Sequence, residues 1–206
     1  MKITRYFQSC LLVEEGNSRI LIDPSGAEAG RLNKFGKLDA VFYTHEHADH
    51  FDAPLCEQLR AAGAIIHANA STAKLIKGDV KIVHDREEFS AGSLGLKAIE
   101  LPHCLMPDGS KGPQNTGYLI NKKLFHPGDG VELMGFEFPN LALPIAGPDV
   151  SIKDALAFAK DVKANKVIPI HYDYIGVKPE VVASFAKNYG FSFEIITLGI
   201  GDSTEI

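Results

Sequence analysis

Residues 40–50 read AVFYTHEHADH, an apolar run followed at once by residue types that bind metals. The apolar part, AVFYT, predicts a short buried β-strand. Behind it come His45, His47, Asp49 and His50. Residues two apart in an extended segment project to the same side, so the first two histidines can hold one cation. Asp49 and His50 then reach a neighbouring position as the chain turns. The spacing therefore predicts a metal site at the end of a strand.

Further donors must come from elsewhere in the chain, because four neighbours on one loop cannot surround two ions. His103, Asp129 and His171 each stand at or just behind the end of a predicted strand. Strand ends gather along one edge of a layered fold, so these side chains can converge with the first cluster although they are distant in sequence. The chain thus offers seven candidate donors, all nitrogen or oxygen ligands.

Strand and helix patterns alternate on both sides of these donors, and the simplest packing is two sheets face to face with helices outside. This predicts an α/β (α+β) fold, a four-layer αβ/βα sandwich, as a single domain over residues 1–206, because no linker, repeat or low-complexity tract divides the chain. Breakers make the loop 102–116 the longest irregular stretch. The predicted strands are 2–7, 10–15, 19–23, 40–44, 64–67, 81–83, 94–101, 117–121, 123–126, 141–145, 167–171 and 194–198, and the predicted helices are 54–62 behind Asp52, 151–163 behind Ser151, and 179–189.

Composition narrows the class of partner. The chain has 206 residues, 45% of them hydrophobic, and a formal net charge of -5, so no basic field draws it to nucleic acid or to an anionic membrane. No apolar run approaches the ~18 residues of a membrane helix. We therefore expect a cytoplasmic protein with a small-molecule substrate, no nucleic acid and no membrane insertion, and leave a homo-oligomer open. Three cysteines without CxxC spacing predict free thiols.

The order of the donors, HxHxDH followed by a lone His, a lone Asp and a final His, resembles the metallo-β-lactamase-fold hydrolase superfamily. The likeness runs from the strand ending at Asp23-Pro24 to Ile170-His171-Tyr172, nearly the whole chain. Within it, the segments 47–52 and 126–129 resemble the branch that contains L-ascorbate-6-phosphate lactonase and N-acyl-phosphatidylethanolamine-hydrolysing phospholipase D. The resemblance implies the metallo-β-lactamase fold for this chain.

Carried over position by position, the resemblance implies two metal ions. His45, His47 and His103 match the ligands of the first ion, Asp49, His50 and His171 match those of the second, and Asp129 matches the bridging ligand. A set of nitrogen and oxygen donors suits Zn²⁺, and it also accepts Mn²⁺ or Fe²⁺. We expect two divalent ions, zinc in both positions.

Three positions depart from relatives of this fold. Asp129 stands where bacterial zinc β-lactamases have Cys, which argues against antibiotic hydrolysis. The branch has Gly-His before the Ser or Ala of its first hairpin, whereas this chain has Phe7-Gln8-Ser9. The usual Thr after the bridging Asp is Gly130 here. The last two departures lie outside the ligand set.

Two divalent ions can hold a bridging water as hydroxide and stabilise a developing oxyanion. Our hypothesis is that this hydroxide attacks the carbonyl centre of a small lactone, ester or amide, with Asp49 as the catalytic residue that orients or relays the proton. Phosphodiester hydrolysis uses the same centre and is the alternative. A non-enzymatic metal-binding sensor or scaffold, and an oxygen-using iron enzyme, are further alternatives.

The other polar residues near these motifs receive simpler interpretations. We expect His67 and His84 to be surface or capping imidazoles. His126 has two interpretations, support of a ligand or strand packing, and no catalytic role. Cys104, next to His103, is expected to be a small buried residue rather than a reactive thiol.

Overall fold

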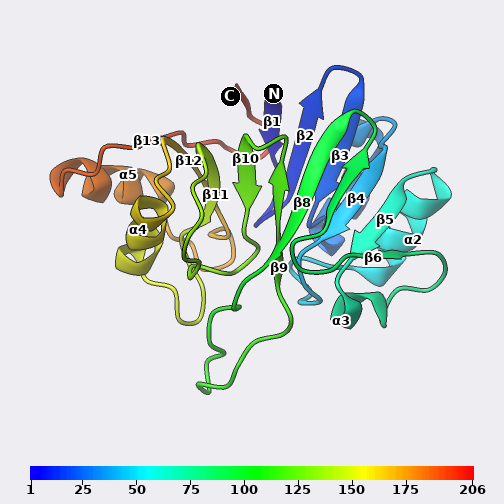
Figure 1. Ribbon diagram of the computed structural model, residues 1–206, viewed down its shortest axis with the longest axis horizontal. Coiled ribbons are helices and arrows are strands. Elements are labelled where there is room, and N and C mark those ends of the chain that lie inside the picture. The colour runs from blue at the N-terminus through cyan, green and yellow to red at the C-terminus, as the bar shows by residue number, and fades with distance from the viewer.

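A computed structural model describes residues 1–206 and consists of two seven-stranded mixed sheets that face each other, with helices on the outer faces (Figure 1). The strand order is β14-β1-β2-β3-β4-β5-β6 in the first sheet and β13-β12-β11-β10-β9-β8-β7 in the second. The first sheet consists of β1 (Lys2–Arg5), β2 (Leu11–Glu15), β3 (Ser18–Ile22), β4 (Ala40–Tyr43), β5 (Ile65–Ala68), β6 (Lys81–Ile82) and β14 (Ser203–Glu205). The second consists of β7 (Glu88–Ala91), β8 (Leu94–Glu100), β9 (Thr116–Ile120), β10 (Leu124–His126), β11 (Asn140–Pro144), β12 (Lys166–Ile170) and β13 (Glu194–Ile195).

Helices cover each sheet on the side away from the other sheet. In Figure 1, α2 and α3 lie at one end of the molecule beside the first sheet, and α4 and α5 lie at the opposite end beside the second. The helical elements are η1 (Gly26–Arg31), α1 (Leu32–Phe35), α2 (Ala53–Ala61), α3 (Ala70–Ala73), α4 (Ile152–Asp161) and α5 (Pro179–Asn188). This arrangement confirms the predicted four-layer αβ/βα sandwich.

Three separate hydrophobic clusters fill the spaces between the four layers. Alternation along the strands creates them, because successive side chains leave a strand on opposite faces. In β11, Ala142 belongs to the cluster between the sheets, whereas Leu141 and Leu143 belong to the cluster under the outer helices. Leu12 of β2 likewise faces outward into a third cluster with α1 and α2, while Leu11 faces the second sheet. Both sheets are therefore buried on both faces.

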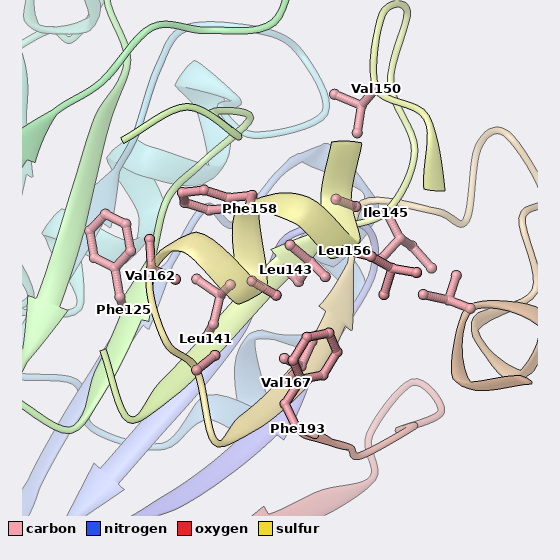
Figure 2. Close-up of a cluster of buried hydrophobic side chains, with 14 of the residues drawn as sticks. Phe125, Leu141, Leu143, Ile145, Val150, Leu156, Phe158, Val162, Val167 and Phe193 are labelled. Carbon is pink, nitrogen blue, oxygen red and sulfur yellow. The ribbon is translucent and has the colours of Figure 1, made fainter. Parts of the chain in front are cut away.

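Figure 2 shows the cluster under α4. Leu156, Phe158 and Val162 descend from the helix and the turn after it toward Leu141 and Leu143 of β11. Burial of a side chain of this size contributes roughly 1.5–3 kcal/mol, so the cluster fixes the helix on the sheet. The loop between β11 and α4, which passes the site described below, is anchored at both ends by this packing.

The predicted helix starts are confirmed. Asp52 accepts a hydrogen bond from the Leu55 amide at 2.8 Å, and Ser151 forms a capping box with Asp154 at the start of α4. The helix expected to reach residue 163 ends at Asp161. The cysteines are free, as predicted.

Two strands were not predicted from the sequence. Glu88–Ala91 forms β7 by antiparallel pairing with β8. Ser203–Glu205 forms β14, which pairs antiparallel with β1. Both are short edge strands. In β7 only Phe89 and Ala91 point to the core, and in β14 the residues are polar, so neither is long or apolar enough to give a clear strand pattern, and pairing with a neighbouring strand defines them instead. None of the helices in the structure is both long and apolar enough to cross a membrane.

Candidate metal centre

The ends of four strands deliver the predicted donors to one place. His45 lies two residues after β4, His103 three residues after β8, Asp129 three residues after β10, and His171 immediately after β12. These strands belong to both sheets, so the donors meet at an edge of the sandwich where the sheets come together. The structure brings all seven predicted donor side chains together. Their assignment as metal ligands stays a prediction.

The HxHxDH segment presents alternate residues to the two sides, as its spacing predicts. Glu46, between the first two histidines, turns away and accepts hydrogen bonds from the hydroxyls of Ser71 at 2.7 Å and Thr72 at 3.2 Å. The chain then turns, because the amides of His50 and Phe51 both donate to the carbonyl of His47. This turn returns His50 to the centre.

The donor atoms form two groups, and within each group they all lie within 4.8 Å of one another. The first donor group is His45, His47, His103 and Asp129, and the second donor group is Asp49, His50 and His171. Asp129 also contacts the second group, because its carboxylate oxygens lie 3.1 Å from His50 Nε2 and 3.2 Å from His171 Nε2. One buried carboxylate therefore touches both groups, which is the geometry of a bridging ligand.

Hydrogen bonds at Nδ1 fix the ring orientation of four histidines. The Nδ1 atom lies 2.6 Å from the Cys104 carbonyl in His103 and 2.7 Å from the Ala146 carbonyl in His171. In His50 it lies 2.8 Å from the Asp23 carboxylate. Each of these oxygens accepts a hydrogen bond. Nδ1 therefore carries the hydrogen and donates it, and Nε2 keeps a lone pair. His45 follows the same pattern with the Thr44 hydroxyl at 3.0 Å.

These lone pairs face one another in a buried space. His50 Nε2, His103 Nε2 and Asp129 Oδ1 are buried and have no hydrogen-bond partner. Buried polar atoms without partners cost several kcal/mol in sum, roughly 1–3 kcal/mol each, unless an ion or a proton satisfies them. Imidazole nitrogens with carboxylates, each imidazole held by a hydrogen bond at its other nitrogen, are the donor set of zinc and related divalent ions. The residues present therefore fit a divalent metal.

The local charges favour a cation at this place. Burial alone raises the pKa of Asp129, yet the neighbouring His50 and His171 hold that pKa well below its ordinary value. Burial lowers the pKa of His103, but the neighbouring carboxylate of Asp129 and the contacts with Cys104 outweigh it and raise the pKa to about 10. The carboxylates thus stay ionised and attract positive charge to the imidazoles. A divalent ion supplies that charge in place of protons.

The turn that carries Asp129 is held from three sides. His126 Nε2 donates to the Ser9 carbonyl at 2.8 Å, and its Nδ1 accepts from the Gly128 amide at 3.3 Å. Asn115 donates to the Pro127 carbonyl at 2.9 Å. Gly128 has φ +62°, and a Cβ there would lie 2.2 Å from the Asn115 side chain, so only glycine fits. Both nitrogens of His126 are occupied, and its role is to support the turn.

Two residues of the site were not predicted from the sequence, and one histidine outside the site has other surroundings than predicted. Asp23, at the end of β3, accepts the Thr44 amide and hydroxyl as well as His50 Nδ1. Gln8 donates to Asp49 Oδ2 at 3.2 Å. A polar residue directly behind an apolar strand was the available signal for Asp23. The prediction for His67 is wrong: it is only 4% exposed and is stacked between Phe42 and Phe89 in the space between the sheets.

A groove of about 880 Å³ adjoins the centre at His103 and Cys104. The segment between β8 and β9, which hangs below the sheets in Figure 1, forms one wall, and α4 contributes to another. Lys111 is the one lysine or arginine among the lining residues, and the carboxylates that line the groove with it are Glu100, Glu132, Asp149, Asp154 and Asp161. The groove therefore disfavours anions.

Comparison with known proteins gives consistent likenesses. Residues 2–171 match the family described as the beta-lactamase superfamily domain. A Mycobacterium tuberculosis protein is 30% identical over 178 residues, which cover 83% of this chain and 84% of the relative. A metal-dependent hydrolase of Christiangramia forsetii is 26% identical, with 100% of both chains covered. Among solved structures, the metallo hydrolase Igni18 of the archaeon Ignicoccus hospitalis has a TM-score of 0.78 at 24% identity, covering 100% of this chain and 98% of that one.

Proposed function

The chain belongs to the beta-lactamase superfamily, and on that premise we propose that it is a metal-dependent hydrolase with a dinuclear centre that opens a small lactone, ester or amide. The observation that carries the proposal is the pair of donor groups joined by the buried carboxylate of Asp129. When bound there, two divalent ions would supply a bridging hydroxide as the nucleophile and stabilise the developing oxyanion. Relatives that share the family are metal-dependent hydrolases by name.

The first donor group would hold one ion and the second donor group the other. Zinc is the proposed metal, because every donor is a nitrogen or an oxygen and four imidazoles are preset by hydrogen bonds at Nδ1. Metal content after expression in defined medium, measured by mass spectrometry, tests both number and identity. Two equivalents of zinc per chain are expected, and a stable single equivalent contradicts the dinuclear proposal.

Asp49 is the proposed catalytic residue. Its side chain is 23% exposed, whereas that of Asp129 is 5% exposed, so Asp49 is the carboxylate of the centre that reaches toward solvent. His171 Nε2 and the Gln8 amide both contact its Oδ2 atom, at 3.1 and 3.2 Å. A carboxylate held in this way can accept a proton from an attacking water and pass it to the leaving group.

The charge of the groove favours a carbonyl substrate over a phosphodiester. A phosphodiester carries a negative charge, and the carboxylates along the groove would repel it. The buried cation of this region, Arg5, is already paired with Asp173 and is only 1% exposed. A neutral lactone, ester or amide meets no such repulsion.

A matched pair of substrates tests the proposed chemistry. The zinc-reconstituted protein is given a panel of small lactones and an activated aryl phosphodiester, with His45→Ala as the background for both. We expect lactone opening that the variant loses and no variant-sensitive cleavage of the diester. Diester cleavage with inert lactones would contradict the carbonyl proposal and place phosphodiester hydrolysis first. Zinc binding without turnover of any substrate would instead support a sensor or scaffold.

A further inference from the structure

We propose that Gln8 is a positioning residue that holds two ligands of the second ion, Asp49 and His171, at the same time. The inference rests on the proposed function and concerns the site of the second ion alone. Gln8 lies in the turn between β1 and β2, more than a hundred residues from His171 in sequence. It is 1% exposed, so its polar atoms must be satisfied inside the protein.

The side-chain amide of Gln8 is fixed from both ends. Its Nε2 donates to Asp49 Oδ2 at 3.2 Å, and its Oε1 accepts the Tyr174 amide at 3.1 Å. Rotating the amide by half a turn would set oxygen against the carboxylate and nitrogen against an N–H, so only one orientation satisfies both partners. The carboxylate of Asp49 is thereby directed toward His171 Nε2, 3.1 Å away.

The backbone of Gln8 holds the other ligand. Its carbonyl accepts the amide of His171 at 3.0 Å. Both residues have positive φ, +53° for Gln8 and +59° for His171, a conformation that costs free energy in residues other than glycine. The hydrogen bond between them ties these two unfavourable conformations together. His171 keeps its position at the end of β12 because Gln8 is there to receive its N–H.

An ion pair between the buried Arg5 and the half-buried Asp173 anchors Gln8 in turn. The backbone N–H of Gln8 donates to Asp173 Oδ2 at 2.6 Å, and the same oxygen pairs with Arg5. Arg5 also lies over the ring of Tyr172, 4.1 Å from the ring centre to the guanidinium carbon. The end of β1 and the three residues after His171 are thus locked to each other, with Gln8 at the centre of the contact.

The first donor group has no contact with Gln8. The hydrogen-bonded partners of its histidines at Nδ1 are Thr44 for His45, Cys104 for His103 and the ring of His45 for His47, each one or two residues away in sequence. Loss of the side-chain amide of Gln8 should therefore lower the affinity for the second ion and leave the affinity for the first ion unchanged. This asymmetry separates a positioning role from a general effect on folding.

Three variants of the full chain test the inference. Gln8→Met keeps the volume and removes both polar contacts. Gln8→His retains an N–H donor for Asp49, and histidine is the residue that the related branch has at the position of Gln8. Gln58→Met is the matched control, because Gln58 is exposed on α2 and forms no side-chain hydrogen bond. Metal-depleted protein is titrated with Zn²⁺ against a chromophoric chelator, and the melting temperature is measured without metal.

We expect Gln8→Met to lower the affinity for the second zinc by at least about tenfold, the usual cost of removing a partner of a metal ligand, with the first zinc unaffected. Gln8→His should recover most of the loss, and Gln58→Met should match the parent. If Gln8→Met also lowers the melting temperature, the recovery by Gln8→His decides the question, and a His variant as weak as the Met variant overturns the inference.

Two further results would count against it in distinguishable ways. A parent that binds two zinc ions and a Gln8→Met variant that binds both equally tightly overturn the role of Gln8 and leave the proposed function standing. A parent that binds only one zinc ion overturns the dinuclear function, and the inference falls with it.

Discussion

The two donor groups of the candidate centre differ in how far away their supports lie. In the first group, His45 and His103 are oriented by Thr44 and Cys104, each one residue distant in sequence. In the second group, His50 is oriented by Asp23, 27 residues away, and His171 by the Ala146 carbonyl, 25 residues away. Asp49 depends on Gln8, 41 residues away. The histidines of the first group have local supports, whereas the second group is supported by distant parts of the chain.

This difference indicates which half of the centre is sensitive to distant substitutions. A local support moves with its ligand, because both belong to the same stretch of chain. A distant support keeps its place only while β1, β3, β4 and β12 remain in register. We therefore expect the second ion to be lost first when the sandwich is perturbed, and the following experiments test that expectation from the largest effect to the smallest.

The largest effect should come from the carboxylate that touches both groups. Asp129→Asn keeps the shape of the side chain and removes the charge shared by His50, His103 and His171. We expect loss of both ions and a fall in kcat/KM of at least about 1,000-fold, or roughly 4 kcal/mol of transition-state stabilisation. Asp79→Asn, an exposed change of the same kind, is the control for the metal analysis and the kinetics. Full metal content in Asp129→Asn would contradict the bridging role.

A smaller effect, largest for the second ion because His50 contacts Asp23 directly and His45 only through Thr44, is expected from Asp23→Asn. Asp23 accepts three hydrogen bonds, two from Thr44 and one from His50. An amide cannot accept all of them, because one of its ends donates. We expect the affinity for the second ion to fall about 10–100-fold and the free energy of unfolding to fall by about 2 kcal/mol.

Zinc titration and urea unfolding of the same Asp23→Asn sample measure both quantities. Equal weakening of the two ions would contradict the separation of the centre into a local and an assembled half. Retention of both affinities would mean that His50 needs no distant support.

His67 lies outside both groups and lacks the hydrogen bond at Nδ1 that orients the site histidines. Burial, followed by the charge of Lys81, lowers the pKa of His67 to about 4. The unfolded chain, with a pKa near 6.5, therefore binds the proton more tightly, so this contribution to stability is complete above about pH 6.5 and is lost as the pH falls toward 4.

Between about pH 7.5 and about pH 5, His67 takes up a proton in the unfolded chain and not in the folded one. This difference should lower the free energy of unfolding by about 2 kcal/mol. His67→Phe, which keeps a ring between Phe42 and Phe89, should remove that part of the acid sensitivity. His84→Gln, at an exposed position, is the control in metal-free urea unfolding. A His67→Phe profile that parallels the parent would show that His67 does not titrate in this range.

The smallest effect is expected at Cys104. The short hydrogen bond of His103 Nδ1, at 2.6 Å, is to the backbone carbonyl of Cys104, whereas the sulfur lies 3.6 Å away, so a side-chain change leaves the short bond in place. Cys104→Ala should cost about 1 kcal/mol of stability, as for loss of one buried methylene-sized group, and leave the affinity for both zinc ions unchanged. A large loss of turnover at unchanged metal content would instead assign a reactive role to the thiol.

Sequence reasoning was most successful where spacing alone carries the information. The HxHxDH segment follows a strand, and its alternation places Glu46 outside and the histidines inside, as the structure confirms. The predicted metallo-β-lactamase fold is likewise confirmed by the family match and by the likeness to Igni18. The edge strand β14 escaped prediction because its polar residues are ordered by pairing with β1, and pairing across the whole chain leaves no local pattern.

His67 illustrates the limit for single polar residues. A histidine at the edge of a strand is typical of a surface, yet β5 is covered on both faces and the ring is stacked on Phe42 from the neighbouring strand. Gln8 and Asp23 illustrate it for the site itself. Each is a single polar residue in a loop that follows a strand. Its sequence neighbours do not indicate which distant side chain it contacts.

The amino-acid sequence by itself determined the kind of protein this is: the alternating apolar runs predict two buried sheets, and the types and order of the seven donors are those of a metal-dependent hydrolase. The tertiary structure alone decided which atoms of those donors face one another, that Asp129 touches both groups, and that Gln8 holds Asp49 and His171. The physical reason is distance along the chain. Residue types and local spacing act within a few residues, whereas the centre exists only after strands from distant parts of the sequence have packed side by side.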